Sequence, residues 1–208
     1  MDMATQATGN EAIYFKRGHG SFGDFSNFSE IPVAYNGLTY RTAEGAFQAQ
    51  KTLDLNERLA FCNMDGKQAK ATGRKVQLRP DWEQVKTDIM ADIQYARILT
   101  DNRFKDLVFM SGTRLILEDT TGWRDNCWGC DFSTKPLGRN LLGICIMLAR
   151  AKYFNDRNIV VCPIPFQPGG SDRFGITEQF KILTGMELAA SFMGNYYNVV
   201  YYRHAYIR

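Results

Sequence analysis

The order of apolar and polar residues predicts short β-strands at the start of the chain. Residues 12–15 form one candidate strand, and residues 31–35 and 38–40 form two more. The last two flank the pair Asn36-Gly37, which is typical of a two-residue hairpin turn because both residues accept positive φ angles. The hairpin leads directly to Thr42, whose hydroxyl can cap the first turn of a helix.

The helix predicted after Thr42 places three functional groups on one face. Glu44, Gln48 and Lys51 are four and three residues apart, so they are neighbours on a helix with 3.6 residues per turn. Spacing alone favours a solvated ion pair, and it is the flanking sequence that favours a functional role. The buried side of the same helix is expected to consist of Ala43, Phe47 and Leu55.

The middle of the chain predicts further helices and one strand. Asp65 can cap a short helix that ends at Gly73, and Pro80-Asp81 opens a longer one. Residues 102–110 continue as a helix, and residues 113–118 alternate as in a strand. The apolar positions of the long helix, which favour burial for its tryptophan, are Trp82, Val85, Ile89, Ile93 and Ala96.

A long loop and a strongly apolar helix follow. Residues 119–139 have a length that, inside a compact domain, is typical of functional or disordered loops. Trp123, Trp128 and Phe132 argue against disorder, because such rings are buried or bind flat ligands. Residues 141–153 are almost wholly apolar, so we expect this helix at the centre of the core.

The C-terminal quarter of the chain has a different pattern. Residues 158–163 predict a strand, residues 176–186 a helix, and residues 196–207 an aromatic β-segment. We therefore predict an α+β fold, with a mostly helical body and short strands over residues 1–154. The extra C-terminal α/β segment, residues 155–208, is expected to pack on that body.

Composition and charge place the chain among ordinary globular proteins. Of its 208 residues, 45% are hydrophobic and 23% are charged, and the net charge of +3 is too small to predict nucleic-acid binding by itself. Residues 1–11 lack the charged-then-apolar pattern of a signal peptide, and the apolar run at 141–149 is shorter than the ~20 residues a membrane span needs. We expect a cytoplasmic protein with no membrane partner.

The cysteine and glycine motifs do not predict a metal or a cofactor. Cys127 and Cys130 have C-x-x-C spacing, but they lie in a loop and the other three of the five cysteines are dispersed. Only two histidines occur, so histidine-based metal or triad chemistry is not expected. Residues 18–23 match G-x-G-x-x-G, yet no helical period follows them, which excludes a dinucleotide fingerprint.

Six motifs occur in order between about residues 20 and 150. They are Gly23-Asp-Phe-Ser-Asn-Phe-Ser29, Tyr40-x-Thr-x-Glu44-x-x-x-Gln48-Ala-Gln-Lys51, Gly73-Arg74, Asp81-Trp82-x-x-Val-Lys86, Asp125-x-x-Trp128-Gly129 and Gly138-x-Asn140-x-Leu-Gly143. Their order and spacing resemble the signatures of the NADAR/YbiA family. The sequence departs from the family pattern at Arg41, Ala43 and Gly45, where family members usually have Pro, Ser and His.

The resemblance implies an N-glycosidase that cleaves a bond between ribose C1 and nitrogen. Two substrate classes are implied: ADP-ribose attached to guanine in DNA or a related nucleotide, and phosphoribosylated pyrimidine intermediates of riboflavin synthesis. It also implies a lysine that forms a Schiff base with the opened ribose. A module that binds ADP-ribose without turnover is the alternative from another class, and the oligomeric state is not indicated.

Glu44 and Lys51 suit this chemistry on physical grounds. Glu44 can transfer a proton at the ring oxygen or the glycosidic nitrogen, and the amine of Lys51 can then attack a carbonyl-like C1. Such a lysine must lose its charge through burial. In the alternative route, Glu44 or Asp131 stabilises an oxocarbenium-like transition state and Lys51 binds phosphate.

The remaining candidates are substrate-binding residues, each with a structural alternative. Asn27 can bond ribose hydroxyls or form an Asx turn, and Trp128 can stack on a base or pack in the core. Arg74 and Arg139 can contact pyrophosphate or remain solvated, and Asn140 can cap its helix instead. The family motifs add Phe25, Gln48, Trp82, Asp125 and Gly129.

Overall fold

The computed structural model describes residues 12–112, 114–135, 137–154, 160–165, 186–193 and 196–203. Its α-helices are α1 (Ala43–Ala49), α2 (Leu55–Ala60), α3 (Gly66–Thr72), α4 (Trp82–Thr100), α5 (Asn102–Ser111) and α6 (Leu141–Phe154), and a 3-10 helix, η1, covers Gly23–Phe25. Its strands are β1 (Ile13–Phe15), β2 (Val33–Tyr35), β3 (Leu38–Tyr40), β4 (Ile116–Glu118), β5 (Val160–Pro165), β6 (Met186–Met193) and β7 (Tyr196–Arg203).

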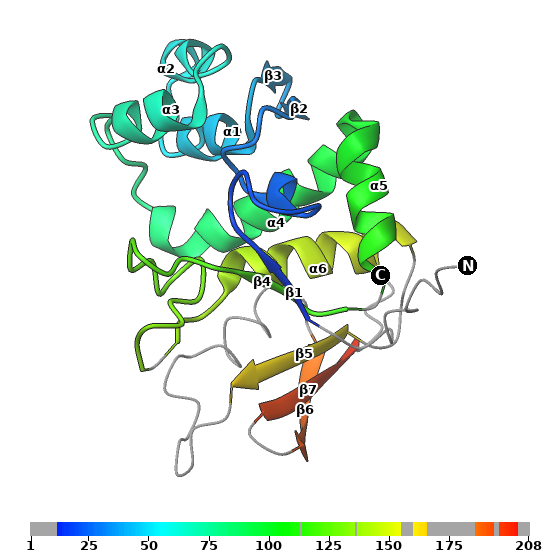
Figure 1. Cartoon of the computed structure of the whole chain (residues 1–208). Helices are drawn as coiled ribbons and strands as arrows, with labels where there is room; N and C mark the ends of the chain where they lie inside the picture. Colours follow the sequence, from blue (N-terminus) through cyan, green and yellow to red (C-terminus); the bar gives the residue numbers. More distant parts are fainter. Residues whose placement is uncertain are drawn as a thin grey trace.

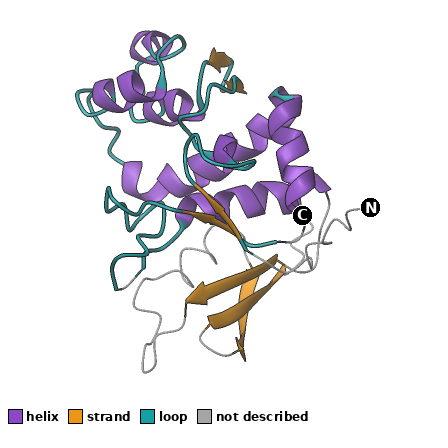
Figure 2. Cartoon of the chain, viewed as in Figure 1, coloured by secondary structure: helices purple, strands orange, loops and turns teal. Residues whose placement is uncertain are grey.

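The body is mostly helical, which confirms the predicted α+β class (Figure 2). Helices α4 and α6 pack against each other through its middle, and α1 lies on α3 and α4 (Figure 1). Ile93 of α4 and Ile146 of α6 are fully buried, as their apolar patterns predicted. Within the described ranges, no helix combines the length and the apolar character that a membrane span requires.

The short strands connect segments that are distant in the sequence. The hairpin β2–β3 is confirmed: Asn36 and Gly37 form its turn with φ angles of 50° and 78°. Strand β1 pairs in parallel with β4, which aligns Phe15 with Glu118 across about a hundred residues of chain. This pairing, visible in Figure 1, was not predicted. It brings the loop that follows β4 next to the turn that follows β1, where Lys16 Nζ donates to Thr121 O at 3.1 Å.

The predicted buried position of Leu55 is wrong. Helix α1 ends at Ala49, and Asp54 caps a second helix by accepting bonds from Asn56 N (2.7 Å) and Glu57 N (3.4 Å). Leu55 is therefore the first residue of α2, and its side chain is 60% exposed. The helical period does not continue across the break, because the new cap resets the direction of the chain.

The C-terminal strands form an antiparallel sheet in the order β5–β7–β6. The strand and β-segment predicted at 158–163 and 196–207 correspond to β5 and β7. Most of the helix predicted over 176–186 lies outside the described residues, and Met186 begins β6. The division into a body over 1–154 and an extension over 155–208 stays a prediction.

Candidate functional site

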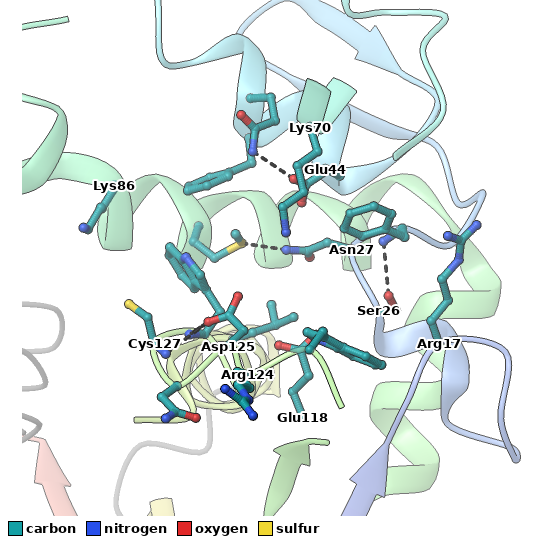
Figure 3. Close-up of a pocket in the computed structure, with 18 of the residues that line it drawn as sticks. Arg17, Ser26, Asn27, Glu44, Lys70, Lys86, Glu118, Arg124, Asp125 and Cys127 are labelled. Atoms are coloured by element: carbon teal, nitrogen blue, oxygen red, sulfur yellow. Dashed lines mark hydrogen bonds between the residues drawn. The ribbon is translucent and has the colours of Figure 1, made fainter. Parts of the chain in front are cut away.

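A pocket of about 1010 Å³ opens between α1 and α3 on one side and the loop between β4 and α6 on the other. The amino-terminal half of α4 forms its floor, with Trp82, Lys86 and Met90. Figure 3 shows Glu44 and Lys70 on one side, Glu118 and Asp125 on the opposite side, and Asn27 between them. Segments that are distant in the sequence therefore meet at one cavity.

Helix α1 supplies the pocket with the predicted polar face. Its start is fixed by Thr42, whose hydroxyl accepts a bond from Gly45 N at 3.0 Å. Glu44 and Gln48 are each about 95% buried, yet both line the pocket together with Lys51. Gln48 Nε2 donates to Glu44 Oε1 at 2.8 Å, and Glu44 N donates to Asn27 O at 2.9 Å. The acid is thus held at both its backbone and its side chain.

Lys51 lies just beyond the carboxyl end of α1 and is anchored separately from Glu44. Its ammonium group donates to Gly73 O at 3.3 Å and lies 5.8 Å from the centre of the Trp82 ring. None of the ion pairs in the described part of the chain joins Lys51 to Glu44. Partial burial lowers the pKa of Lys51, and the charge of Glu44 opposes that shift without cancelling it.

The carboxyl group of Glu44 titrates in the opposite direction. Burial raises its pKa above the usual value, while the bond from Gln48 and the charges of Lys70 and Lys51 oppose the change. A raised carboxyl pKa and a lowered amine pKa both favour the neutral forms. Both pKa shifts are in the direction that proton donation by Glu44 and nucleophilic attack by Lys51 would require.

Glu118 is a pocket residue that the sequence did not reveal. Burial raises its pKa to about 8, and the negative charges of Asp125 and Glu44 add to the effect. Its backbone N–H donates to Asn140 Oδ1 at 3.0 Å, so the end of β4 is held in place. The available signal was a carboxylate at the end of a predicted strand, directly before the aromatic loop.

Asp125 lines the same wall and shapes the turn that carries Trp128. Its Oδ1 accepts bonds from Cys127 N at 3.0 Å and from Trp128 N at 2.9 Å. Cys127 belongs to the pocket lining, whereas Cys130 is buried, and both are free thiols. Among the described residues, no group of three or more His, Cys, Asp or Glu is arranged to hold a metal ion.

Aromatic rings line the pocket beside the polar groups. Phe47 lies between two tryptophans, with ring centroids 5.0 Å from Trp82 and 5.2 Å from Trp128. Trp82 is only 6% exposed but still contributes to the pocket wall, so it serves both the core and the cavity. Trp128 is less buried and offers the more accessible ring for a flat ligand.

The lining of the pocket is rich in cationic side chains. Arg17 and Lys70 lie 5.4 and 5.6 Å from the ring of Phe28, which places two positive charges around one aromatic side chain. A cluster of this kind attracts an anionic ligand such as a phosphate ester. The cationic lining residues are Lys16, Arg17, Lys51, Lys70, Arg74, Lys86 and Arg124.

Two predicted residues lie away from the cavity. Phe25 is fully buried in the core, where its ring contacts Phe15, Phe22 and Phe104. Asp131 is also buried and does not line the pocket; its Oδ1 accepts bonds from Ser133 N and Ser133 Oγ, which lower its pKa. Neither Phe25 nor Asp131 therefore belongs to the lining of the cavity.

Gly129, Arg139 and Asn140 also lie outside the pocket lining. A β-carbon at Gly129 would collide with Thr120, so this glycine allows the loop to pack closely. Both ends of the Asn140 amide bind β4, by donating to Ile116 O at 2.9 Å and by accepting from Glu118 N. The predicted residues that do meet at the cavity are Asn27, Glu44, Gln48, Lys51, Arg74, Trp82, Asp125 and Trp128.

Comparison with known proteins identifies the family of this chain. The model of the NADAR domain matches residues 13–153, about two thirds of the chain. An N-glycosidase of Nostoc punctiforme is 31% identical over 149 residues, which cover 69% of this chain and 93% of that protein. The N-glycosidase YbiA of Escherichia coli K12 is 32% identical over 132 residues, which cover 62% of this chain and 80% of that protein.

A solved structure supports the same family. The NMR structure of YbiA from Escherichia coli superimposes with a TM-score of 0.62 at 29% identity, covering 74% of this chain and 91% of that one. Its coverage agrees with the domain match, and that match includes the segments that build the pocket. The chain belongs to the NADAR family.

Proposed function

We propose that this chain is an N-glycosidase that cleaves the ribose C1–N bond of ADP-ribosylated guanine in DNA, or of a related nucleotide. Its family and the N-glycosidases among its relatives make it a hydrolase of N-glycosyl bonds. One observation supports the proposed chemistry of Glu44 and Lys51. Glu44 and Lys51 line one cavity, and the pKa of each shifts toward its neutral form.

The reaction starts with a proton from Glu44. Protonation of the ribose ring oxygen lets the glycosidic nitrogen push the ring open, which leaves an iminium at C1. The raised pKa of Glu44 favours the protonated carboxyl that this step requires. The carboxyl is held by Gln48 rather than by Lys51, so it can turn its proton toward the sugar without breaking an ion pair.

Lys51 then replaces the base at C1. Its neutral amine attacks the iminium carbon, the base leaves with a proton, and a Schiff base joins lysine and sugar. Water adds to that Schiff base and releases the aldehyde form of the ribose, which closes to the free sugar while the lysine amine is regenerated. In the alternative route a carboxylate stabilises an oxocarbenium-like transition state, and only Glu44 of the two predicted carboxylates lies in the cavity for that task.

The cavity supports a substrate of nucleotide size with several phosphate oxygens. Its volume of about 1010 Å³ is at the upper end of small-molecule pockets. Arg74 and Lys86 supply charge for a pyrophosphate, and Trp128 supplies a ring for a base. A duplex substrate would have to extrude its modified base, which costs a few kcal/mol unless the base is already unpaired.

The test is a direct comparison of substrates. The chain is incubated with an ADP-ribosylated guanine oligonucleotide, and in parallel with a phosphoribosylated pyrimidine intermediate of riboflavin synthesis, and products are measured by mass spectrometry. We expect release of ADP-ribose from the oligonucleotide. Turnover of the pyrimidine alone would favour the second substrate class, and tight binding without release would favour a non-catalytic module.

The Schiff base is tested with borohydride and two variants of Lys51. Reduction during turnover should leave a covalent adduct on Lys51, and Lys51→Ala should abolish both the adduct and the activity. Lys51→Arg keeps the positive charge but cannot form the adduct, so it separates phosphate binding from nucleophilic attack. An active Lys51→Arg enzyme without an adduct would move the chemistry to the carboxylate route.

A further inference from the structure

A buried cation lies behind the wall of the pocket and fixes the groups around it. Arg97 of α4 is fully buried, and burial lowers its pKa to about 9, so it is still protonated at neutral pH. Its guanidinium donates to Asp24 O (2.8 Å), Phe25 O (3.1 Å) and Ser26 O (3.2 Å). A guanidinium offers donors only, so every polar group that faces it must be an acceptor.

This requirement orients the amide of Gln94. Arg97 donates to Gln94 Oε1 at 2.9 Å, one turn earlier on the same helix. The oxygen end of the amide is thereby fixed, and the NH₂ end must point the other way. Gln94 Nε2 donates to Asn27 Oδ1 at 2.8 Å and lies 3.3 Å from the sulfur of Met90. Gln94 is fully buried, so both ends of its amide rely on these protein partners.

The orientation of the Gln94 amide in turn fixes the amide of Asn27, which lines the pocket. Its Oδ1 is occupied by Gln94, so its NH₂ end is the end left for other partners. Asn27 Nδ2 lies 3.4 Å from the sulfur of Met90, a weak acceptor that also lines the cavity (Figure 3). In the described part of the chain, no oxygen or nitrogen accepts from Asn27 Nδ2.

We propose that Arg97 and Gln94 act as positioning residues that lock the side-chain amide of Asn27 with its NH₂ toward the pocket, so that Asn27 is a hydrogen-bond donor to a sugar oxygen of the substrate. The choice of a sugar as the ligand rests on the proposed function. Asn27 and Glu44 are neighbours in the pocket, because Glu44 N donates to Asn27 O at 2.9 Å, so a sugar oxygen that accepts from Asn27 would lie close to the proposed acid.

The lock makes an unusual prediction for two substitutions of Gln94. Gln94→Glu keeps an acceptor toward Arg97 and strengthens that bond, but it presents a second acceptor to Asn27. Asn27 must then turn its NH₂ toward the new carboxylate and its oxygen toward the pocket. Gln94→Met removes both bonds and leaves the Asn27 amide without a fixed orientation. If Gln94 were only a packing residue, the Met variant would be the more damaging one.

The experiment measures amide orientation and ligand affinity in the full chain. In wild type, the Asn27 side-chain NH₂ should give nuclear Overhauser contacts to the Met90 methyl group. In Gln94→Glu, the resonance of one Asn27 side-chain NH₂ proton should shift downfield, because that proton now bonds the new carboxylate. The dissociation constant for ADP-ribose, measured by calorimetry, should rise at least tenfold in Gln94→Glu and less in Gln94→Met, while the Glu variant keeps or gains thermal stability.

A double substitution isolates the path through Asn27. Once Asn27→Ala has removed the amide, Gln94→Glu should change the affinity for ADP-ribose by less than twofold. Unchanged Asn27 signals in Gln94→Glu, or a larger affinity loss in Gln94→Met than in Gln94→Glu, would overturn the lock. A wild type that neither binds nor releases ADP-ribose would instead overturn the proposed substrate, and the Asn27 signals would still decide on the lock.

Discussion

Replacing Gly73 with alanine tests how α3 holds the pair of Glu44 and Lys51. Gly73 ends α3 with a φ of −64° and a ψ of −8°, values that alanine adopts without strain. An added β-carbon would lie 2.8 Å from Gln48 Cδ and 2.9 Å from Gln48 Cβ, and closer still to Gln48 Oε1. The main effect of Gly73→Ala is therefore to push on Gln48.

The size of the effect follows from these distances. Ordinary contact begins at 3.4 Å, so Gln48 Cδ must retreat by about 0.6 Å and its Oε1 by more. The bond of 2.8 Å from Gln48 Nε2 to Glu44 Oε1 does not survive a shift of this size without a compensating rotation. Overpacking lowers the free energy of unfolding by about 1–3 kcal/mol. Alanine also restricts the unfolded chain more than glycine does, which raises the free energy of unfolding by about 0.4–1 kcal/mol. A catalytic group displaced by about 1 Å typically loses about 100-fold in rate.

Two measurements separate stability from activity. Thermal unfolding should show a melting temperature lower by about 2–8 °C in Gly73→Ala, as expected for a loss of about 1–2 kcal/mol in a chain of this size. The rate of sugar release should fall about 100-fold. Gln48→Ala is the matched variant, since it removes the bond to Glu44 without adding volume.

The double variant then decides the mechanism of the effect. If Gly73→Ala acts through Gln48, it should add little to the rate loss of Gln48→Ala. Wild-type turnover in Gly73→Ala, or full additivity of the two rate losses, would refute this account of the site.

Three further predictions follow from the site and the fold. Gln48→Ala removes a bond that lowers the pKa of Glu44, so the limb of the pH–rate profile that Glu44 governs should move to higher pH; a profile identical to wild type would contradict the assigned acid. The folded-state pKa of Glu118, about 8, lies above its unfolded value, so the folded state holds the extra proton and stability should fall as pH rises between about 4.5 and 8. Glu118→Gln should remove the contribution of this carboxyl, seen as denaturant midpoints that fall less steeply than those of wild type between about pH 5 and about pH 8.5, while the raised pKa of Glu44 leaves a smaller fall. Thr42→Ala should cost about 1 kcal/mol of unfolding free energy through the lost cap of α1, measured by urea denaturation, whereas Thr42→Ser should stay near wild type.

Local signals explain why the acid-bearing helix was predictable. The cap at Thr42 and the spacing of Glu44, Gln48 and Lys51 act over about ten residues, and the structure places all three side chains at one cavity. The error at Leu55 has the same origin. A helical period was extended beyond α1, although Asp54 is itself a typical cap and marks a new start.

Contacts between distant segments explain what the sequence did not reveal. Glu118 reaches the pocket because β4 pairs in parallel with β1, and nothing within either segment specifies that pairing. Arg97 lies at a position that helical spacing alone would leave unassigned, and only the fold shows its bonds to the chain around residues 24–26. Asn140 was placed near the right loop, but its two bonds to β4 make it a support of the pocket wall.

The end of α3 has a double role that explains why the acid and the amine can work side by side. An ion pair between Glu44 and Lys51 would hold the lysine charged and unreactive. In the mechanism we propose, Gly73 contributes to separate anchors for the two groups: its carbonyl oxygen accepts a bond from Lys51, and its missing side chain leaves room for Gln48 to bond Glu44. One backbone position thus keeps the two groups on separate anchors. Gly73→Ala keeps the carbonyl that Lys51 binds and pushes only on Gln48, so it should disturb mainly the proton transfer, as Gln48→Ala should.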